Sequence, residues 1–315
     1  MEFAAFSDSK YAIVLANGTV ALDLILQDLV VGAGDEVVVT SRTFLASVSS
    51  IVMAGGAPVF ADVDSDLQNV AAETIAAVVT PKTRAIICVY LAGWPCDMDP
   101  MMELAKQHDL FVIEDCAQDH GARYKGRSVG SIGHAGAWSF YQEKIMTTGG
   151  EGGIVICNDR DLWSRMWSFK DHGKSWSAIY EREHPPGFRW LHESFGTNWG
   201  MTEMQGVLGR IQLTRMDDWR SARHVIWDTA SSLPGLGVPQ VPHELEHAAY
   251  KCYVFVEPET LAQVVFWPAG FAWVIGCVDW RECECSSTRI CGRQQRRRNG
   301  RSCYSGCGCK YHCRW

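Results

Sequence analysis

Apolar runs rich in β-branched residues alternate with helical patterns through the first 160 residues. The runs predict strands at 36–40, 58–64, 84–92, 110–117, 136–141 and 152–159. Between the early runs, residues 19–30, 44–56 and 71–79 have the periodicity of helices. Strands that are apolar throughout are buried on both faces. The alternation therefore predicts an α/β fold, a mostly parallel sheet in a three-layer domain.

The chain after residue 160 predicts further elements. Residues 200–223 form an amphipathic pattern that predicts one helix, and residues 250–259 read as the start of a smaller unit. We therefore expect a large domain over 1–225, with a short N-terminal segment, and the start of a small C-terminal domain over 226–260. The remaining residues, 261–315, are of a different kind, so we expect the small domain to be truncated or aberrant.

Charge and cysteine content both change near residue 260. Residues 261–315 carry nine basic and three acidic residues, a net charge of +6, whereas residues 1–260 carry 20 basic and 33 acidic residues, a net charge of −13. Eight of the 13 cysteines lie from Cys277 onward. Their C-x-C and C-x3-C spacings differ from the paired C-x2-C of zinc ribbons, so we expect no metal site. The absence of any apolar period predicts a poorly ordered tail, read out of frame.

The overall composition excludes several classes of function. The chain has 315 residues, 47% of them hydrophobic, and a net charge of −7, which disfavours nucleic acid and anionic membrane as partners. No apolar run reaches the roughly 18 to 20 residues of a membrane span. The N-terminus lacks the features of a signal peptide, so we expect a cytoplasmic protein.

Three groups of residues are candidates for chemistry. Gly18 and Thr19 begin a predicted helix, where free N–H groups suit a phosphate, although an ordinary helix cap has the same pattern. Asp115 ends a predicted strand and needs a cationic partner if it is buried, although it is also typical of a structural carboxylate. Ser139 and Lys144 precede a glycine cluster, where a lysine can form a Schiff base, whereas most single lysines are simply solvated.

The order of these groups is more specific than any one of them. A phosphate-binding helix start, a strand-end aspartate and a lysine 29 residues after it together describe a pyridoxal 5'-phosphate site. The aspartate would face the pyridinium nitrogen and the lysine would form the imine. A nicotinamide dehydrogenase is disfavoured, because no G-x-G-x-x-G follows a strand near the N-terminus.

Longer motifs extend the pattern. They are "NGTVALDLIL", "DEVVVTSRTFLASVSSIVMAGGAPVFADVD", "EDCAQDHGARYKGRSVGSIGHAGAWSFYQEKIMTTGGEGG" and "FGTNWGMTEMQGVLGRIQL". With them the chain resembles, from about residue 3 to 258, the nucleotide-sugar aminotransferases of the DegT/StrS type. These are fold type I pyridoxal phosphate enzymes, so the resemblance implies a large domain of that fold.

The resemblance also implies a role for each site residue. Lys144 would form the imine with the cofactor, Asp115 would pair with the pyridinium nitrogen, and Gln118 would contact the phenolic oxygen. The phosphate would be held by Gly18, Thr19 and Ser139, with Phe44 stacked on the ring. Asn198 would reach the phosphate in the partner subunit's site, which makes the expected enzyme a homodimer.

The implied reaction moves the amino group of glutamate to a keto group of a nucleotide-linked deoxysugar, in the synthesis of cell-surface polysaccharides or glycosides. Related sugar 3-dehydratases carry histidine in place of the imine lysine, so Lys144 favours amino transfer. The alternative is a non-catalytic relative that keeps the large-domain fold but lacks a competent closed site.

Overall fold

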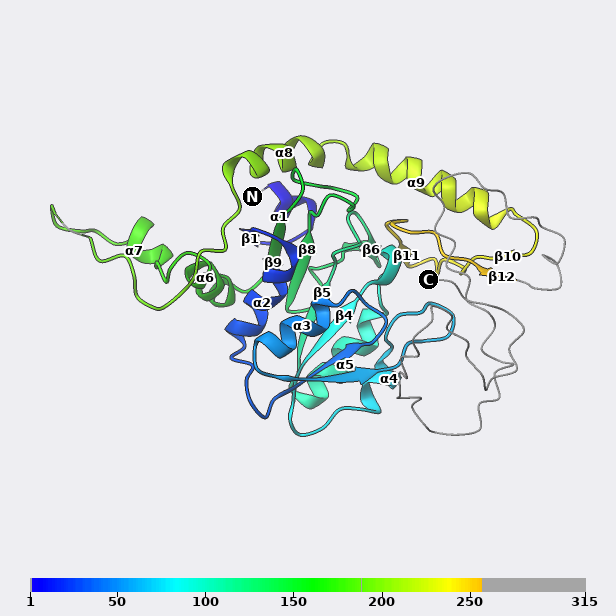
Figure 1. The fold of residues 1–315 in the computed structure, drawn as a ribbon, viewed down its shortest axis with the longest axis horizontal. Helices are drawn as coiled ribbons and strands as arrows, with labels where there is room; N and C mark the ends of the chain where they lie inside the picture. Colours follow the sequence, from blue (N-terminus) through cyan, green and yellow to red (C-terminus); the bar gives the residue numbers. More distant parts are fainter. Residues whose placement is uncertain (1, 188, 257–315) are drawn as a thin grey trace, which may run out of the picture. The chain divides into compact units, whose positions relative to one another are not determined.

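A seven-stranded sheet forms the centre of the fold (Figure 1). The structure, a computed structural model, describes residues 2–187 and 189–256, and they fall in one compact unit. The strand order is β1-β9-β8-β5-β4-β2-β3. The strands are β1 (Tyr11–Leu15), β2 (Glu36–Thr40), β3 (Ala57–Ala61), β4 (Thr83–Val89), β5 (Phe111–Asp115), β8 (Ala135–Ser139) and β9 (Gly153–Cys157). Each strand predicted from an apolar run is present.

The sheet is mostly parallel, as the sequence predicts. The pairs β2–β3, β2–β4, β4–β5 and β5–β8 are parallel, whereas β9 is antiparallel to both of its neighbours, β1 and β8. Alternate residues of the central strands enter different apolar clusters. Ile86 and Cys88 of β4 belong to one cluster, and Ala85, Ile87 and Val89 belong to the other. Both faces of the sheet are therefore buried, which explains why its strands are apolar throughout.

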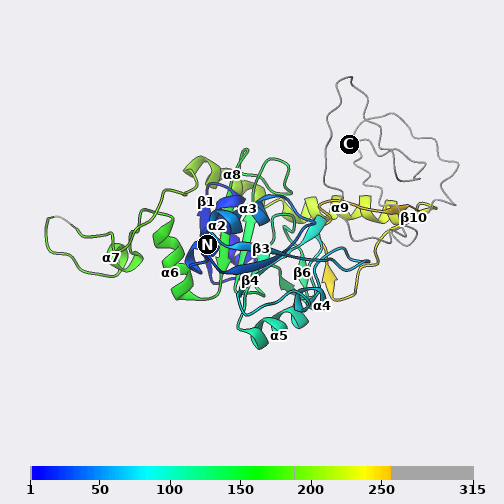
Figure 2. The ribbon, with the colours of Figure 1, turned by 60° about the horizontal axis from the view of Figure 1, so that its bottom comes forward.

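Helices cover the two faces and complete three layers (Figure 2). On one face, α2 (Gly18–Asp28), α3 (Ala46–Met53) and α6 (Arg160–Phe169) contribute their buried side chains to one cluster. On the other, α1 (Glu2–Phe6), α4 (Ala72–Ala76) and α5 (Met98–His108) contribute to the second cluster. The α/β class and the three-layer arrangement are thus confirmed.

The prediction of a single helix over 200–223 is wrong. The structure has two helices there, α8 (Glu203–Leu213) and α9 (Met216–Ser231). A capping box starts the first helix, because Thr202 accepts a hydrogen bond from Gln205 N and the side chain of Gln205 accepts one from Thr202 N. Arg215, at φ −105° and ψ 2°, has left the helical conformation and separates the two. The apolar period continues across this break, which is why the sequence alone did not reveal it.

The chain after α9 contributes to two small sheets that are separate from the seven-stranded one. Two short ladders form, β10 (Leu236–Gly237) with β12 (Phe255–Val256), and β11 (Leu245–Glu246) with β6 (Arg123–Tyr124), which also pairs with β7 (Arg127–Ser128). The predicted boundary at 225/226 falls inside α9, and the division into domains stays a prediction. The predicted tail over 261–315 lies outside the described residues.

The remaining described helices are short. They are η1 (Leu91–Gly93), a 3-10 turn after β4, and α7 (Trp176–Tyr180). Within 2–187 and 189–256, no helix combines the length and the apolar character that a membrane crossing requires.

One buried carboxylate organises the turn before β8. Glu114 is fully buried and accepts hydrogen bonds from Tyr90 Oη (2.6 Å), Gly130 N (2.6 Å), Ile132 N (2.8 Å) and Gly133 N (2.5 Å). Its neighbour on β5 is Asp115, whose side chain emerges on the opposite face of the sheet because successive residues of a strand alternate. The strand therefore uses one carboxylate for the fold and leaves the next for the site.

We predict that Glu114→Ala lowers the free energy of unfolding by about 3 kcal/mol or more, because three buried amides and a hydroxyl lose their acceptor. Urea denaturation followed by circular dichroism measures the change. Tyr90→Phe is the matched control, since it removes a single hydrogen bond and costs about 1 kcal/mol. Equal midpoints for the two variants would contradict this account.

Candidate active site

The first turn of α2 lies against the end of β8. Gly18 is the first residue of α2, and a Cβ placed on it would lie 2.6 Å from Ser139 Cβ. Only glycine permits this approach. Asn17 caps the helix by accepting a hydrogen bond from Val20 N (3.0 Å), whereas Thr19 is exposed. The start of this helix and the Ser139 hydroxyl thus lie close together, and such an arrangement suits an anionic oxygen group.

Asp115 is the last residue of β5, and it is 6% exposed. Ser47 Oγ donates a hydrogen bond to its Oδ2 (2.6 Å), and Ala117 N donates one to its Oδ1 (3.2 Å). Burial raises the pKa of this carboxyl, while the two donors and the nearby charge of Lys144 act in the opposite direction. A cationic partner would restore the charged form, as expected of a carboxylate that faces a pyridinium nitrogen.

Lys144 lies in the loop after β8 and is half-buried. Its Nζ lies 5.1 Å from the centre of the Tyr250 ring. Burial lowers the pKa of this amine and the charge of Lys251 lowers it further, whereas the carboxylates of Asp115, Asp119 and Glu143 raise it. A lowered pKa increases the fraction of neutral amine, which is the form that attacks an aldehyde.

Gln118 and Phe44 are placed by the loops around Asp115. The Oε1 atom of Gln118 accepts a hydrogen bond from Ala92 N (2.7 Å), which ties the side chain to η1. Phe44 is 71% exposed and lies in the turn before α3, three residues from the Ser47 that binds Asp115. Both residues belong to the carboxyl edge of the sheet, and their roles toward a cofactor stay predictions.

Asn198 is set apart from this group. It is exposed, lies in the segment before α8 and forms an isolated bridge with Asp171. The adjacent Trp199 accepts a hydrogen bond through its carbonyl from Ala16 N (2.8 Å), at the end of β1. No described hydrogen bond joins Asn198 to another predicted site residue. Its predicted action is in a partner subunit, which this single chain does not test.

Sequence reasoning missed several residues that lie against the site. Ser47 binds Asp115, and Tyr250 and Lys251 lie near Lys144, from a segment more than 100 residues further along the chain. His120 is fully buried, and its ring centre lies 5.3 Å from that of Trp138. Burial and the charge of Lys144 lower the pKa of His120 to about 3, so its ring is neutral. No local sequence signal marks these residues, because tertiary contacts bring them together.

Asp119 is a second buried carboxyl beside the site. It is fully buried, and neither carboxyl oxygen has a hydrogen-bond partner among the described residues. Burial and the charge of Asp115 raise its pKa well above the usual range, and the charge of Lys144 opposes this only in part. Asp119 is therefore protonated at lower pH and is unfavourably buried when it ionises.

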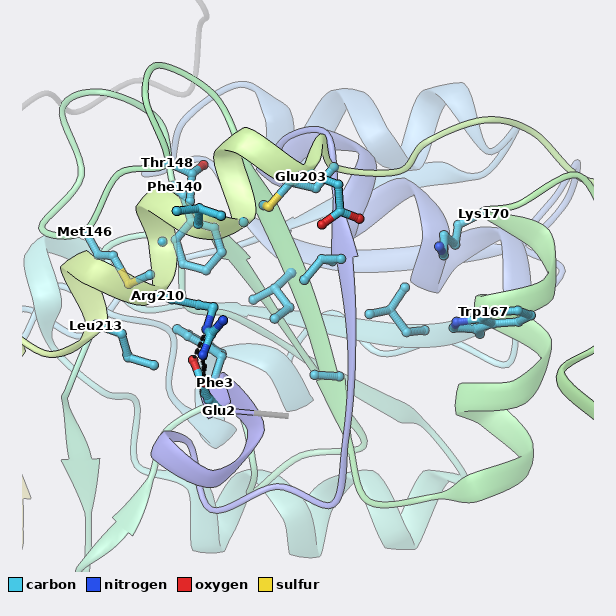
Figure 3. A pocket seen from close by; sticks show the side chains of 18 residues that line it. Glu2, Phe3, Phe140, Met146, Thr148, Trp167, Lys170, Glu203, Arg210 and Leu213 are labelled. Carbon is cyan, nitrogen blue, oxygen red and sulfur yellow. Dashed lines mark hydrogen bonds and ion pairs between the residues drawn. The ribbon is translucent and has the colours of Figure 1, made fainter. Parts of the chain in front are cut away.

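A separate cavity of about 450 Å³ lies between α8, the edge strand β1 and α6 (Figure 3). Glu2 and Arg210, which line this cavity, form an ion pair with Arg210 Nη2 2.7 Å from Glu2 Oε1 (Figure 3). Neither Lys144 nor Asp115 lines this cavity, so it is not part of the candidate site.

We predict that Asp119→Asn stabilises the protein above pH 7. A carboxyl whose pKa is raised on folding weakens the fold as pH rises from its unfolded value of about 3.9, so the amide variant gains at high pH and loses the advantage near pH 4. Thermal unfolding at several pH values is the measurement, with a gain of at least about 3 °C expected at pH 8. The control is Asp109→Asn at an exposed position. A gain that does not vary with pH would contradict the interpretation.

Comparisons with known proteins identify the family of the chain. The profile of the DegT/DnrJ/EryC1/StrS aminotransferase family matches residues 1–265. A GDP-perosamine synthase of Escherichia coli O157:H7 is 41% identical over 227 residues, and a dTDP-3-amino-3,4,6-trideoxy-alpha-D-glucose transaminase of Streptomyces venezuelae is 36% identical over 242 residues. The alignments cover 72% and 76% of this chain, but the chain spans only 59% and 61% of the length of these relatives.

Solved structures give the same result. The X-ray structure of the aminotransferase from Psychrobacter cryohalolentis superposes with a TM-score of 0.79 at 60% identity, over 82% of this chain and 68% of that one. The family is dependent on pyridoxal phosphate. The chain belongs to the DegT/DnrJ/EryC1/StrS aminotransferase family.

Proposed function

We propose that this protein is a pyridoxal phosphate-dependent aminotransferase that moves the amino group of glutamate to a keto group of a nucleotide-linked sugar. The observation that carries the proposal is that Lys144 is half-buried and has a lowered pKa. The buried Asp115, at the carboxyl edge of the sheet, lies near enough for its charge to act on that amine. The names of the two curated relatives, with their GDP- and dTDP-linked products, support the class of substrate.

The described residues fit the cofactor in both shape and chemistry. The approach of Gly18 to Ser139 leaves no room for a side chain at the start of α2, so backbone amides are presented to a phosphate. Asp115 has two donors and a raised pKa, so it gains from a cation. The amine of Lys144 is shifted toward its neutral form. The helix start would thus meet the phosphate, Asp115 the pyridinium nitrogen and Lys144 the aldehyde.

Each side chain then has a defined task. Asp115 would keep the pyridine nitrogen protonated, and Gln118, held by its hydrogen bond from Ala92 N, would donate from its amide NH2 group to the phenolic oxygen. Gly18, Thr19 and Ser139 would hold the phosphate, and Phe44 would pack against the ring. When bound, the cofactor supplies an electron sink that stabilises negative charge on the donor's α-carbon.

Lys144 carries the proton in this scheme. Its Nζ would act as a general base and then as a general acid, moving a proton between the α-carbon of the amino donor and C4′ of the cofactor. The neutral form needed for the first step is favoured by burial and by the charge of Lys251. Asp115 and Asp119 oppose this shift, which keeps the amine able to hold a proton for the second step.

We predict that the purified protein, incubated with pyridoxal phosphate, develops an imine absorption band at the edge of the visible range. Lys144→Ala abolishes the band and amino transfer. The matched control is Lys170→Ala, since Lys170 is also half-buried, lies 5.4 Å from the Trp167 ring centre and has a pKa lowered by burial. Turnover of glutamate with a 4-keto sugar nucleotide tests the reaction itself.

Two results would contradict the proposal. A band that persists in Lys144→Ala would reject the role of this lysine. A band that is bleached neither by glutamate nor by any other amino acid would show a cofactor-binding protein without amino transfer, the non-catalytic alternative.

We also propose that the active form is a homodimer in which α8 lies at the interface. Exposed apolar side chains follow one another on this helix: Met204 (77% exposed), Val207 (55%), Leu208 (43%) and Ile211 (51%). A monomer would leave this face to water, so a second copy of the chain is its proposed cover. Asn198, in the segment that leads into α8, would then reach the partner subunit's phosphate.

We predict that Val207→Asp converts the dimer to a monomer and weakens cofactor binding, because it buries an unpaired charge in the interface. Sizing chromatography with light scattering measures the assembly. Val225→Asp, on the exposed surface of α9 (63% exposed), is the control that stays dimeric. A wild-type protein that elutes as a monomer with full activity would overturn the proposal.

A further inference from the structure

Two lysines share the ring of Tyr250. Lys144 Nζ lies 5.1 Å from the ring centre and Lys251 Nζ lies 5.6 Å from it. Two ammonium groups on one aromatic ring repel each other, and the charge of Lys251 lowers the pKa of Lys144 for this reason. The arrangement therefore places the positive charge of Lys251 beside the candidate catalytic amine.

The backbone of this segment is fixed to the site. Ala248 N donates a hydrogen bond to Gly93 O (2.8 Å), and Lys251 N donates one to Ala92 O (3.1 Å). These bonds attach the segment to η1, the same turn whose Ala92 N binds Gln118. Gly93, at φ +99°, allows the approach, since a Cβ there would lie 2.9 Å from Tyr250 N. The backbone of Lys251 is thus held beside the turn that binds Gln118, and its side chain lies over the same ring as that of Lys144.

Asp115, Asp119 and Glu143 act on the charge of Lys144, whereas Lys251 forms no ion pair with a described carboxylate. Lys251 is exposed, and no ion pair of the described residues includes Lys251, Lys144 or Arg223. Arg223 is half-buried, donates its Nη1 to Tyr250 O (3.2 Å), and burial lowers its pKa. Two ammonium groups thus border the ring of Tyr250 and a guanidinium binds its backbone carbonyl, so an anion bound there would relieve the repulsion among these cations.

We propose that Lys251 is a further binding residue of this site, and that its ammonium group, held over Tyr250 beside Lys144, takes an anionic oxygen group of the incoming substrate. The inference rests on the proposed function, in which glutamate brings carboxylates and the nucleotide sugar brings phosphates. Both kinds of substrate would present an anionic oxygen to Lys251.

A structural role does not account for the position of Lys251. A cation over an exposed aromatic ring stabilises a fold by only about 0.5–1 kcal/mol. Lys125 shows the structural case in the same chain, since its Nζ lies 5.1 Å from the Tyr124 ring centre and also 2.5 Å from Asp99 Oδ2. Lys251 has the same ring geometry without the carboxylate, so the charge that completes it comes from a ligand.

The test compares Lys251→Gln, Lys251→Arg and the control Lys125→Gln by calorimetry on the purified protein. The probes are inorganic pyrophosphate and glutarate, the dicarboxylate that lacks the amine of glutamate. We expect Lys251→Gln to weaken one probe about tenfold, the loss of one charge-assisted hydrogen bond. Lys251→Arg should bind within about threefold of the wild type, and Lys125→Gln should bind unchanged. Loss of pyrophosphate binding identifies the sugar nucleotide as the source, and loss of glutarate binding identifies the amino donor.

Steady-state kinetics supply an independent readout. Lys251→Gln should raise the KM of the matching substrate with kcat nearly unchanged, because the residue binds both the ground state and the transition state. Equal binding of both probes by wild type and Lys251→Gln, or no binding of either probe by the wild type, overturns the inference. A wild type that binds a probe through Lys251 but never turns over would reject the proposed reaction and leave this inference standing, so the two failures are distinguishable.

Discussion

The carboxylate of Asp115, buried at the end of a parallel strand, is the constraint on which the site depends. Removal from water makes its charge unfavourable, and Ser47 and Ala117 compensate only in part. A cation would meet the remaining cost, and the pyridinium nitrogen of the proposed cofactor is such a cation. The same burial acts on Lys144 in the opposite direction, since loss of hydration favours the neutral amine. Burial at one edge of the sheet therefore raises the pKa of a carboxyl and lowers the pKa of an amine.

Neighbouring elements turn this edge into a site. Glycine at the start of α2 brings backbone amides against Ser139, and the turn after β4 positions Gln118 through Ala92. The segment after α9 places Tyr250 and Lys251 beside Lys144. Strand ends thus supply the chemistry, whereas a distant segment supplies the surrounding charge. In the proposed scheme, substrate binding by Lys251 and proton transfer by Lys144 therefore rest on different segments of the chain.

Much of the fold could be predicted because its signals are local. Continuous apolar runs predicted the strands of the parallel sheet, since both of its faces are covered. The break between α8 and α9 was missed because one non-helical residue, Arg215, does not disturb the apolar period. The ladders of two residues, such as β11 with β6, carry too few residues for any period and arise from tertiary pairing.

The sequence by itself determined the order of Gly18, Asp115, Ser139 and Lys144, because strand ends and helix starts can be recognised from local patterns. Its longer motifs carried the resemblance to the family. Only the tertiary structure decided which other side chains meet them. Ser47, Asp119, Tyr250 and Lys251 act through distance and burial, and neither quantity is encoded by spacing along the chain. Electrostatic effects depend on separation in space and on exclusion of water, so they appear only once the chain has folded.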